Sequence, residues 1–461
     1  MSDFQIVSPV DGSIYANCRY AERGEIMKAV EAGKEAFKSW KVTPFDERVD
    51  VIRNFVAEVV KRREKLAELV TWQMGRPFWQ ADEAGRLEVV ADVLVENARE
   101  VLKPVNEKSD PDVKRVIEPE PLGVCLSICA WNYPVAMTAS LILAPLLMGN
   151  VVIFKHAPQT ALIADVFGEA AKASGMPEGI FQTMHMAHAD AEALIGSGEL
   201  GLVQFIGSAR GGHAVYDAGR GTFTQYGLEL GGKDPVYLRS DVQIDRIMGD
   251  LLEGCYGNAG QSCCSVERIY VHKDLYGRFV DAFTEATAGV TLGHPIEEKT
   301  FIGPLVSATA ANRVKGLVSE AVGKGAKALL PSGKSPLVGD GTAYMEPQIL
   351  VDVDHSMAIM KEETFGPVMP VMSVESDEEA VALMNDSQYG LTAAIWSNDI
   401  DRAVALGHQV ESGTFYVNRC DHADLYLPFG GVKESGIGRS YGLKGLEELV
   451  TTRSFHIRTL G

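Results

Sequence analysis

The chain has 461 residues, 46% hydrophobic and 23% charged, a composition typical of a soluble globular protein with two or three structural units. Its 62 acidic residues against 43 basic ones give a formal charge of -19, which would repel polyanions, so no nucleic acid partner is expected. The seven cysteines, scattered apart from the pair Cys263-Cys264, form no metal-binding spacing, so we expect free thiols in a reducing compartment and no metal.

The amino-terminal half gives no sign of export or membrane insertion. The opening MSDFQIVSPVDG lacks a basic start followed by an apolar stretch, so it is not a signal peptide and a cytoplasmic location is expected. The stretch Val135–Phe154 is apolar enough for a membrane span, but Pro145 interrupts it and Gly149-Asn150 marks a turn. We therefore predict a buried helix, then a buried strand, and no membrane partner.

The periodicity of apolar residues predicts an α/β protein. From Ala21 to about Val101 these residues recur at helical spacing, so the chain opens with helices. From Pro121 onward, short apolar runs alternate with helical stretches, which indicates a parallel sheet with crossover helices. The predicted elements are the strand Val124–Ile128, the helix Val135–Met148, the strand Val151–Phe154, the helix Ala161–Ala173, and the strands Phe181–Met184 and Leu202–Ile206.

A second α/β unit is predicted after Glu229. It includes a strand at Arg268–Val271 and a helix at Leu275–Ala288. Two further strand-like segments, Asp112–Pro119 and Leu449–Arg458, lie at places where they could leave the body of the molecule. The competing interpretation is that both are ordinary edge strands.

Two loops follow predicted strands of the first unit, on the side of a parallel sheet where ligands bind. Asn132 comes just after the first strand, and its amide can donate a hydrogen bond to a developing oxyanion, although a turn residue before Pro134 is the plainer interpretation. The turn Gly207–Gly212 opens a predicted helix, whose N–H groups favour phosphate. It is not the GxGxxG fingerprint, so its spacing alone is weak evidence.

Two residues are candidates for covalent chemistry. Glu229 lies between apolar neighbours, a setting that raises a carboxyl pKa toward neutrality and suits a general base, whereas a surface glutamate is the alternative. Cys263 follows a glycine-containing turn, and its thiolate would attack a carbonyl carbon. Taken alone, such a cysteine is more often an inert buried thiol.

Taken together, seven stretches resemble the aldehyde dehydrogenase superfamily in content and order, over nearly the whole chain. They are Trp131-Asn132-Tyr133-Pro134, Phe154-Lys155-His156-Ala157-Pro158, Gly207 to Gly212, Glu229-Leu230-Gly231-Gly232-Lys233, Asn258 to Cys263, Glu362 to Val368, and Pro428 to Gly436. The resemblance implies an aldehyde-dehydrogenase-like α/β fold, with two α/β domains, open mainly parallel sheets and a small β oligomerisation element.

The resemblance also implies roles for individual residues. Cys263 matches the nucleophile, Glu229 the general base, and Asn132 the side chain that completes the oxyanion hole with the Cys263 N–H. The implied reaction is oxidation of an aldehyde to its acid through a thioester that water then hydrolyses, because relatives that pass the acyl group to coenzyme A typically lack this glutamate. The residues that match the cofactor site are Trp131, Lys155, Gly207, Ser208, Gly212, Glu363 and Phe365.

The cofactor and the substrate are less sharply defined. Many strictly NAD-dependent relatives carry a glutamate three positions after the ribose lysine, and here that position is Pro158, so NAD or NADP is expected. The positions expected to line the aldehyde tunnel are small and polar, which favours a short polar aldehyde or a semialdehyde. They are Tyr133, Ala136, Ser140, Ser262, Cys264, Ala423 and Phe429.

Two features near the tunnel leave alternatives open. The loop Arg419–Asp424 mixes charges of both signs and is interpreted as a solvated loop, so it selects neither a carboxylate-bearing nor an amino-bearing aldehyde. Cys264 could form a vicinal disulfide with Cys263 under oxidation, although a simple tunnel-lining role is the plainer alternative.

The resemblance implies the following domains: a cofactor-binding domain over residues 1–230, interrupted near 103–121, a catalytic domain over 231–440, and an oligomerisation element from 103–121 and 441–461. A homodimer or homotetramer is expected. Two other functions remain open: a cysteine-dependent esterase or hydrolase without cofactor, and a non-catalytic family member. Retention of candidates for nucleophile, base and oxyanion donor argues against the second.

Overall fold

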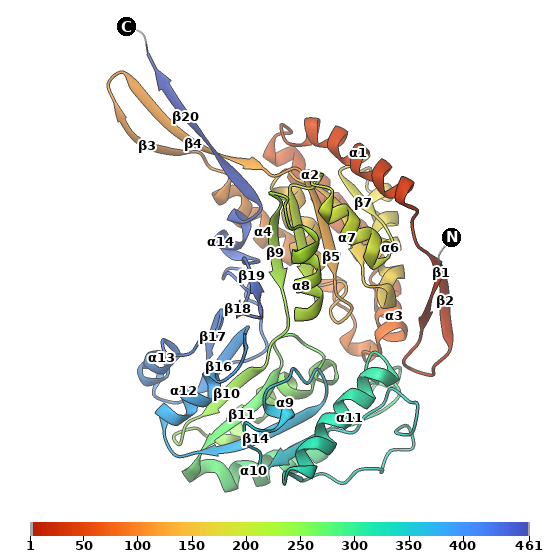
Figure 1. Ribbon diagram of the computed structural model, residues 1–461, viewed down its shortest axis with the longest axis vertical. Helices are drawn as coiled ribbons and strands as arrows, with labels where there is room; N and C mark the ends of the chain where they lie inside the picture. The colour runs from red at the N-terminus through yellow and green to blue at the C-terminus, as the bar shows by residue number, and fades with distance from the viewer. Residues whose placement is uncertain (1–2, 460–461) are drawn as a thin grey trace.

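The computed structural model describes residues 3–459 and contains two large sheets whose strands are mainly parallel (Figure 1). The predicted α/β class is thereby confirmed. The first sheet has the strand order β19-β9-β8-β5-β6-β7, and only β19 runs antiparallel to its neighbour. Its strands are β5 (Val124–Cys129), β6 (Val151–His156), β7 (Phe181–Thr183), β8 (Leu202–Ile206), β9 (Gln225–Glu229) and β19 (Gly436–Ile437).

Helices cover both faces of the first sheet, which is why β5 and β6 read as unbroken apolar runs and are buried along their whole length. One core lies between the sheet and helices α1 and α7, and the other lies between the sheet and the remaining helices of this unit. These helices are α1 (Arg23–Trp40), α2 (Phe45–Val60), α3 (Arg63–Met74), α4 (Leu87–Val101), α6 (Ala161–Ala173) and α7 (His188–Gly196). The helix α8 (Ala209–Ala218) follows β8 directly.

The second sheet has the order β12-β13-β14-β11-β10-β16-β17, parallel except for the pair β12 and β13. Its strands are β10 (Asp234–Leu238), β11 (Val266–His272), β12 (Lys327–Ala328), β13 (Gln348–Val351), β14 (Val368–Val374), β16 (Thr392–Trp396) and β17 (Thr414–Val417). Its helices are α9 (Ile244–Tyr256), α10 (Lys273–Ala288), α11 (Ala308–Gly323), α12 (Asp377–Asn385) and α13 (Ile400–Gly407). A single large core surrounds this sheet.

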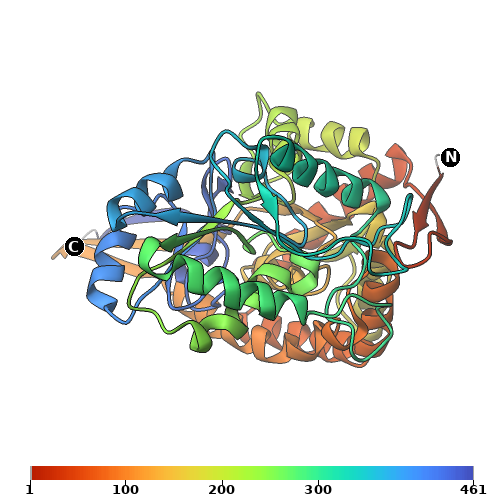
Figure 2. The ribbon, with the colours of Figure 1, turned by 90° about the horizontal axis from the view of Figure 1, so that it is seen from below.

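The two strand-like segments form a separate antiparallel arm with a third strand. The arm consists of β3 (Val105–Asp110), β4 (Val113–Pro121) and β20 (Val450–Arg458), and it projects from the body at the upper left of Figure 1. Because the segments pair with each other, they are not edge strands of either large sheet. Figure 1 and Figure 2 both place this arm on the opposite side of the molecule from the hairpin of β1 (Asp3–Val7) and β2 (Ile14–Arg19).

The predicted helix Val135–Met148 is too long. Residues 134–137 form a turn, and helical geometry covers only a π-helical segment, Ala139–Leu143, and α5 (Ala144–Leu147). Pro145 has no N–H to donate, which accounts for the wider turn just before it. The segment is buried as predicted. None of the helices in residues 3–459 has both the length and the apolar character required to traverse a bilayer.

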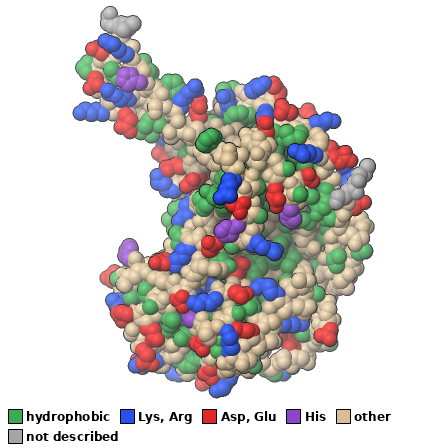
Figure 3. All heavy atoms as spheres, in the orientation of Figure 1, with side chains coloured by type: hydrophobic (Ala, Val, Ile, Leu, Met, Phe, Trp, Pro, Cys, Tyr) green, Lys and Arg blue, Asp and Glu red, His purple; other side chains and the backbone are tan. Residues whose placement is uncertain are grey.

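Further short elements are the paired strands β15 (Tyr389–Gly390) and β18 (Val432–Lys433) and the helix α14 (Gly442–Glu447), which packs against α4. Acidic and basic side chains are interspersed over the face seen in Figure 3, where no basic patch gathers among the described residues. The predicted domain boundaries stay a prediction, and their outermost residues, 1–2 and 460–461, lie outside the described residues.

Candidate active site

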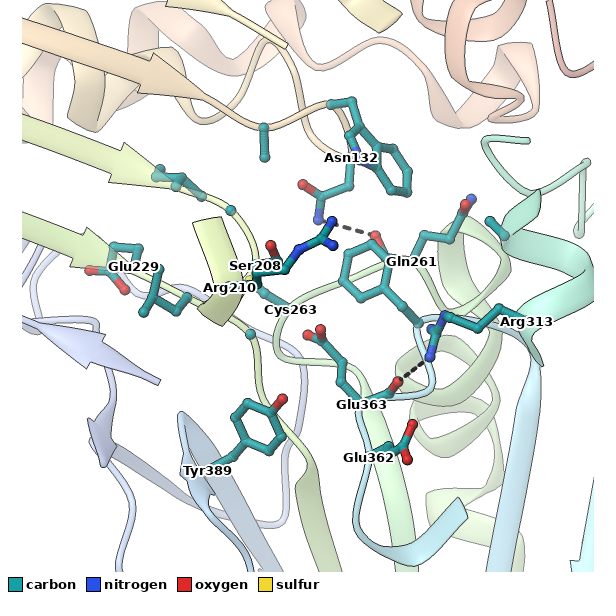
Figure 4. Close-up of a pocket in the computed structure, with 18 residues that line it drawn as sticks. Asn132, Ser208, Arg210, Glu229, Gln261, Cys263, Arg313, Glu362, Glu363 and Tyr389 are labelled. Carbon is teal, nitrogen blue, oxygen red and sulfur yellow. Dashed lines mark hydrogen bonds between the residues drawn. The ribbon is translucent and has the colours of Figure 1, made fainter. Parts of the chain in front are cut away.

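A cavity of about 440 Å³ lies where the two units meet, and both units contribute to its wall (Figure 4). The carboxyl ends of β5, β8 and β9 face it, as expected for a ligand site on a parallel sheet. Of the residues singled out in the sequence, those that line it are Trp131, Asn132, Gly207, Ser208, Glu229, Cys263, Glu363 and Phe365. Lys155 and Gly212 do not line it.

Cys263 lies in the loop that precedes β11. The three residues Asn258, Ala259 and Gly260 all have positive φ (51°, 59° and 70°), so the chain turns tightly just before the cysteine. A Cβ on Gly260 would stand 2.5 Å from the carbonyl oxygen of Gly366, so glycine is required at that position. The thiol is half-buried and on the cavity wall, which is the exposure that a nucleophile needs.

Asn132 is buried, and its side chain reaches toward the cysteine loop. Its Nδ2 donates to the Gln261 carbonyl at 3.2 Å (Figure 4), which leaves the second amide hydrogen for a ligand. Its own carbonyl accepts from the Arg76 guanidinium at 2.6 Å and from the Asn258 amide at 3.1 Å. Arg76 is in turn paired with Glu83 at 2.6 Å. The candidate oxyanion donor is therefore held in place by a buried polar network.

Glu229 ends β9 with both carboxylate oxygens buried and without a hydrogen-bond partner among the described residues. Burial raises the pKa of Glu229 to about 8, so the group can exchange a proton near neutral pH. Ser440 and Arg439 lie close enough to oppose part of this rise in pKa, but neither makes a hydrogen bond of normal geometry with the carboxylate. In Figure 4 the carboxylate points away from Cys263, so it must rotate to act there.

The turn after β8 leads into a capped helix N-terminus, a structure that can bind an anion. Ser208 caps α8, with its Oγ accepting from the Gly211 N–H at 3.2 Å. A Cβ on Gly212 would stand 2.6 Å from the Leu230 side chain, so this glycine lets α8 pack closely behind the cavity wall. The N-terminus of α8 and the exposed Arg210 side chain both face the cavity.

Glu363 lies in a loop that is fixed from behind. Its carboxylate accepts from the Gly232 N–H at 3.1 Å, and burial together with the charge of Glu267 raises the pKa of Glu363 to about 7. The buried Glu267 carboxylate accepts from the N–H groups of Thr364 at 2.7 Å and Phe365 at 2.8 Å. It also pairs with Lys233 at 2.9 Å. Glu267 therefore fixes the backbone on both sides of the turn.

Two aromatic rings meet at the cavity wall. Phe365 has a φ of 49°, and its ring meets that of Trp131 edge-to-face with centroids 5.5 Å apart. Lys155 lies at the end of β6, buried, and donates no hydrogen bond to a described residue. Burial lowers the pKa of Lys155 to about 8. Pro158 begins a 3₁₀ turn. Because this residue is a proline, the position carries no carboxylate that would repel a 2′-phosphate.

The predicted tunnel residues lie beside Cys263 but outside this cavity. Cys264 and Phe429 pack together with Leu391, and Cys263 itself contacts that cluster. Cys264 donates to an oxygen of Asp421 at 3.0 Å.

Two more of the predicted tunnel residues, Ser262 and Tyr133, lie next to that cluster. Ser262 also donates to Asp421, at 2.8 Å. The interpretation of Arg419–Asp424 as a solvated loop is therefore wrong at Asp421, because these two donors draw its carboxylate inward. The ring of Tyr133 lies under the Arg76 guanidinium, 4.1 Å from its centroid.

Sequence reasoning missed Arg76, Glu267 and Asp421. No local pattern marks Arg76 or Glu267, since their partners stand up to 182 positions away in the chain. A signal for Asp421 existed, because it is an acidic residue shortly before the recognisable stretch that begins at Pro428. Arg419 in the same loop carries the opposite charge, so the sequence offered no reason to single out Asp421. Among the described residues, no group of three or more His, Cys, Asp and Glu side chains could hold a metal ion.

Comparisons with known proteins agree with one another. The family model described as the aldehyde dehydrogenase family matches residues 1–455. The succinate-semialdehyde dehydrogenase (NADP+) of Deinococcus radiodurans is 32% identical over 457 residues, 98% of this chain and 94% of that protein. The crystal structure of an aldehyde dehydrogenase from Brucella melitensis biovar abortus 2308 matches with a TM-score of 0.95 and 27% identity, covering 100% of this chain and 95% of the other. A point mutant of betaine aldehyde dehydrogenase from Staphylococcus aureus, in complex with NAD+, matches with a TM-score of 0.93 and 28% identity, covering 99% and 93%.

Proposed function

Because the chain belongs to the aldehyde dehydrogenase family and is an NAD(P)-dependent aldehyde dehydrogenase, we propose that it oxidises a short polar aldehyde to the carboxylic acid through a thioester on Cys263. One observation carries this proposal: the cavity wall brings together a half-buried thiol, a carboxyl group of raised pKa and an amide donor from three distant segments. The proposed nucleophile, general base and oxyanion donor therefore line the same cavity.

The residues around the cavity fit a dinucleotide cofactor. The capped N-terminus of α8, with glycines at Gly207 and Gly211, suits a pyrophosphate, and Arg210 adds a positive charge beside it. The Glu363 carboxylate, partly buried and facing the cavity, suits a ribose hydroxyl. Lys155 does not line the cavity, but its ammonium group donates no hydrogen bond to a described residue, which supports a role at the second ribose. When bound, NAD(P)+ supplies the hydride acceptor for the reaction.

The chain's own residues supply the rest of the chemistry. The Cys263 thiolate attacks the aldehyde carbon, and the oxyanion that forms takes a hydrogen bond from Asn132 and from the Cys263 N–H. After oxidation, Glu229 removes a proton from the water that attacks the thioester, so the acid is released and the thiolate returns. The raised pKa of Glu229 suits this task because the group both takes up and gives away a proton near pH 8.

The decisive experiment measures NAD(P)H formation by the purified protein with short aliphatic, amino-bearing, carboxylate-bearing and aromatic aldehydes, using NAD+ and NADP+ separately. We expect turnover with short polar aldehydes, loss of turnover in Cys263→Ala, and full turnover in Cys18→Ala, whose thiol lies on β2. Equal activity of Cys263→Ala and the wild type would refute the role of Cys263.

The competing function is a cofactor-independent esterase or hydrolase that uses the same thiol and carboxylate. Hydrolysis of a nitrophenyl ester together with no reduction of either cofactor would favour it. A protein that binds NAD(P) but turns over neither aldehydes nor esters would instead be a non-catalytic family member.

We also propose that the arm of β3, β4 and β20 joins copies of the chain into a homodimer or homotetramer. The exposed fractions of two apolar side chains on β20 support this proposal: they are 36% for Phe455 and 44% for Ile457. Light scattering tests this proposal by comparing the molar mass of the full chain with that of the double variant Phe455→Ser, Ile457→Ser. The double variant should have the lower mass.

A further inference from the structure

Asp421 lies next to the nucleophile although no motif marks it. Its Oδ1 accepts hydrogen bonds from Ser262 at 2.8 Å and from Cys264 at 3.0 Å, the two residues on either side of Cys263. The positive φ of Asp421, 45°, turns the loop so that the carboxylate faces inward. A carboxylate is therefore anchored within one residue of the reactive thiol.

Asp421 stands on the side of Cys263 from which the aldehyde must arrive. The 440 Å³ cavity that fits the cofactor is lined by Cys263 but not by Cys264 or Asp421. Cys264 packs with Phe429 and Leu391 in a cluster that Cys263 and Tyr441 also contact. If the cofactor occupies that cavity, the substrate has to approach Cys263 from outside it, and this cluster and Asp421 are groups beside Cys263 that lie outside the cavity.

The negative charge of Asp421 has no cation paired with it among the described residues. Its two hydrogen-bond donors are neutral, and the Arg76 guanidinium, whose charge acts on Asp421 from a distance, is paired with Glu83. Burial raises the pKa of Asp421, while the Cys264 and Ser262 donors oppose that rise. A second carboxylate, that of Glu253, has its pKa raised by burial and by repulsion from Asp421. The other charged or titratable groups of the loop are Arg419, which is exposed, His422 and Asp424.

We propose that Asp421 makes this enzyme prefer aldehydes that carry a positively charged group, such as aminoaldehydes, over semialdehydes that end in a carboxylate. The inference rests on the proposed function and names its substrate class. An ammonium group in the tunnel would supply the charge that Asp421 lacks, whereas a carboxylate would be placed against a like charge in a half-buried site, where screening by water is weak. The substrate class then differs from the one in the name of the Deinococcus relative.

The test uses two pairs of aldehydes matched in shape. In the first pair, 3-aminopropanal is compared with butanal, because an ammonium and a methyl group have similar size. In the second, succinate semialdehyde is compared with 4-methylpentanal. We expect kcat/KM to favour 3-aminopropanal over butanal about tenfold and to disfavour succinate semialdehyde against 4-methylpentanal by a similar factor.

The variant Asp421→Asn keeps the acceptor oxygen and removes the charge, so both ratios should move toward one. Asp424→Asn is the matched control, since Asp424 lies in the same loop and, among the described residues, its carboxylate accepts only from the Tyr426 N–H, at 3.0 Å. Wild-type ratios near one, a preference for succinate semialdehyde, or ratios unchanged in Asp421→Asn would overturn the inference while aldehyde oxidation stands. No turnover of any of the four aldehydes, neutral ones included, would overturn the proposed function itself.

A second measurement does not depend on turnover. Iodoacetate and iodoacetamide alkylate a thiol by the same chemistry and differ in charge. The rate with iodoacetate divided by the rate with iodoacetamide, measured at Cys263 by peptide mass, should rise about tenfold in Asp421→Asn, because the anionic reagent is no longer repelled. The same ratio should stay constant in Asp424→Asn. An unchanged ratio in a folded Asp421→Asn protein would contradict a field of Asp421 at the nucleophile.

Discussion

The two sides of Cys263 are built in different ways. On the side proposed to bind the cofactor, here called the cofactor side, which comprises Gly207, Ser208, Glu363 and Phe365, backbone groups form the site: a capped helix end, and a turn whose N–H groups are bound by Glu267. On the side proposed to bind the aldehyde, here called the aldehyde side, which comprises Tyr133, Cys264, Asp421 and Phe429, side chains contact other side chains across long stretches of sequence. Backbone geometry demands particular residues at fixed spacing, and side-chain contacts do not.

Glu229→Gln should give the largest effect. The substitution should slow the hydrolysis of the thioester and leave the binding of cofactor and aldehyde unchanged. We expect thioester hydrolysis to slow by about 10²–10⁴, the usual contribution of general base catalysis, while acylation continues. A burst of NAD(P)H equal to the enzyme concentration, followed by slow turnover, is the expected trace. Prompt steady turnover without a burst would remove Glu229 from the mechanism, and the exposed Glu447→Gln serves as control.

The pH dependence of the same step sharpens this assignment. Because the base must be ionised and the pKa of Glu229 is raised to about 8, hydrolysis should accelerate as pH rises through about 8 and fall about tenfold per unit below it. Single-turnover decay of the acyl-enzyme between pH 6 and 9 measures this. A profile of the wild type identical to that of Glu229→Gln would assign the inflection to another group.

Asn132→Ala should lower kcat by about 10²–10³, the loss of roughly 2.7–4 kcal/mol that follows removal of one oxyanion donor. The KM for the cofactor should change little, because Asn132 acts at the thiol rather than on either side. Steady-state kinetics with each substrate varied in turn separates the two constants. The exposed Asn17→Ala, on β2, should match the wild type, and a rise in cofactor KM alone would show that Asn132 binds the cofactor instead.

Glu267→Gln should affect the cofactor side alone. Since Glu267 binds the N–H groups of Thr364 and Phe365, the variant loosens the turn that carries Glu363, and we expect the KM for NAD(P) to rise about tenfold with a smaller loss of kcat. The charge ratios between aldehydes should be unchanged. If kcat fell and KM did not, Glu267 would serve the chemistry at Cys263 rather than the cofactor.

Gly212→Ala should give the smallest effect. The added Cβ would meet the end of the Leu230 side chain at 2.6 Å, and that side chain can shift, so α8 should move only by a few tenths of an ångström. A two- to threefold rise in cofactor KM is expected, as a rough figure for so small a displacement. Gly277→Ala, whose Cβ meets nothing within 4 Å, is the matched control.

The difference between the two sides explains what the sequence could predict. The alternation of apolar runs predicted the helix Ala161–Ala173 and the strand Leu202–Ile206 to the residue, and β5, β6 and β7 to within two residues, because buried parallel strands need unbroken apolar stretches. The strands β9 and β19 of the same sheet were not predicted. The π-helical turn before Pro145 was not predicted, since it depends on a missing hydrogen-bond donor within a uniformly apolar segment.

For the site, seven cofactor residues were predicted from motifs, and five of them line the cavity, the exceptions being Lys155 and Gly212. Asp421 was misjudged because its environment depends on Ser262 and Cys264, 159 and 157 positions earlier in the chain. Charges that balance along a loop do not balance in space, because Arg419 is exposed whereas the Asp421 carboxylate is bound by the residues on either side of Cys263. The sequence alone could not make that distinction.

The strand β19 completes the surroundings of Glu229 late in the synthesis of the chain. It pairs with β9 so that Gly436 lies opposite Glu229, and just beyond it Arg439 and Ser440 border the carboxylate. The nucleophile, the oxyanion donor and the helix that fits the phosphate all leave the ribosome more than 150 residues before this strand. A growing chain therefore holds a thiol without the surroundings that tune its base, and the catalytic cycle can close only when the final segment has been synthesised.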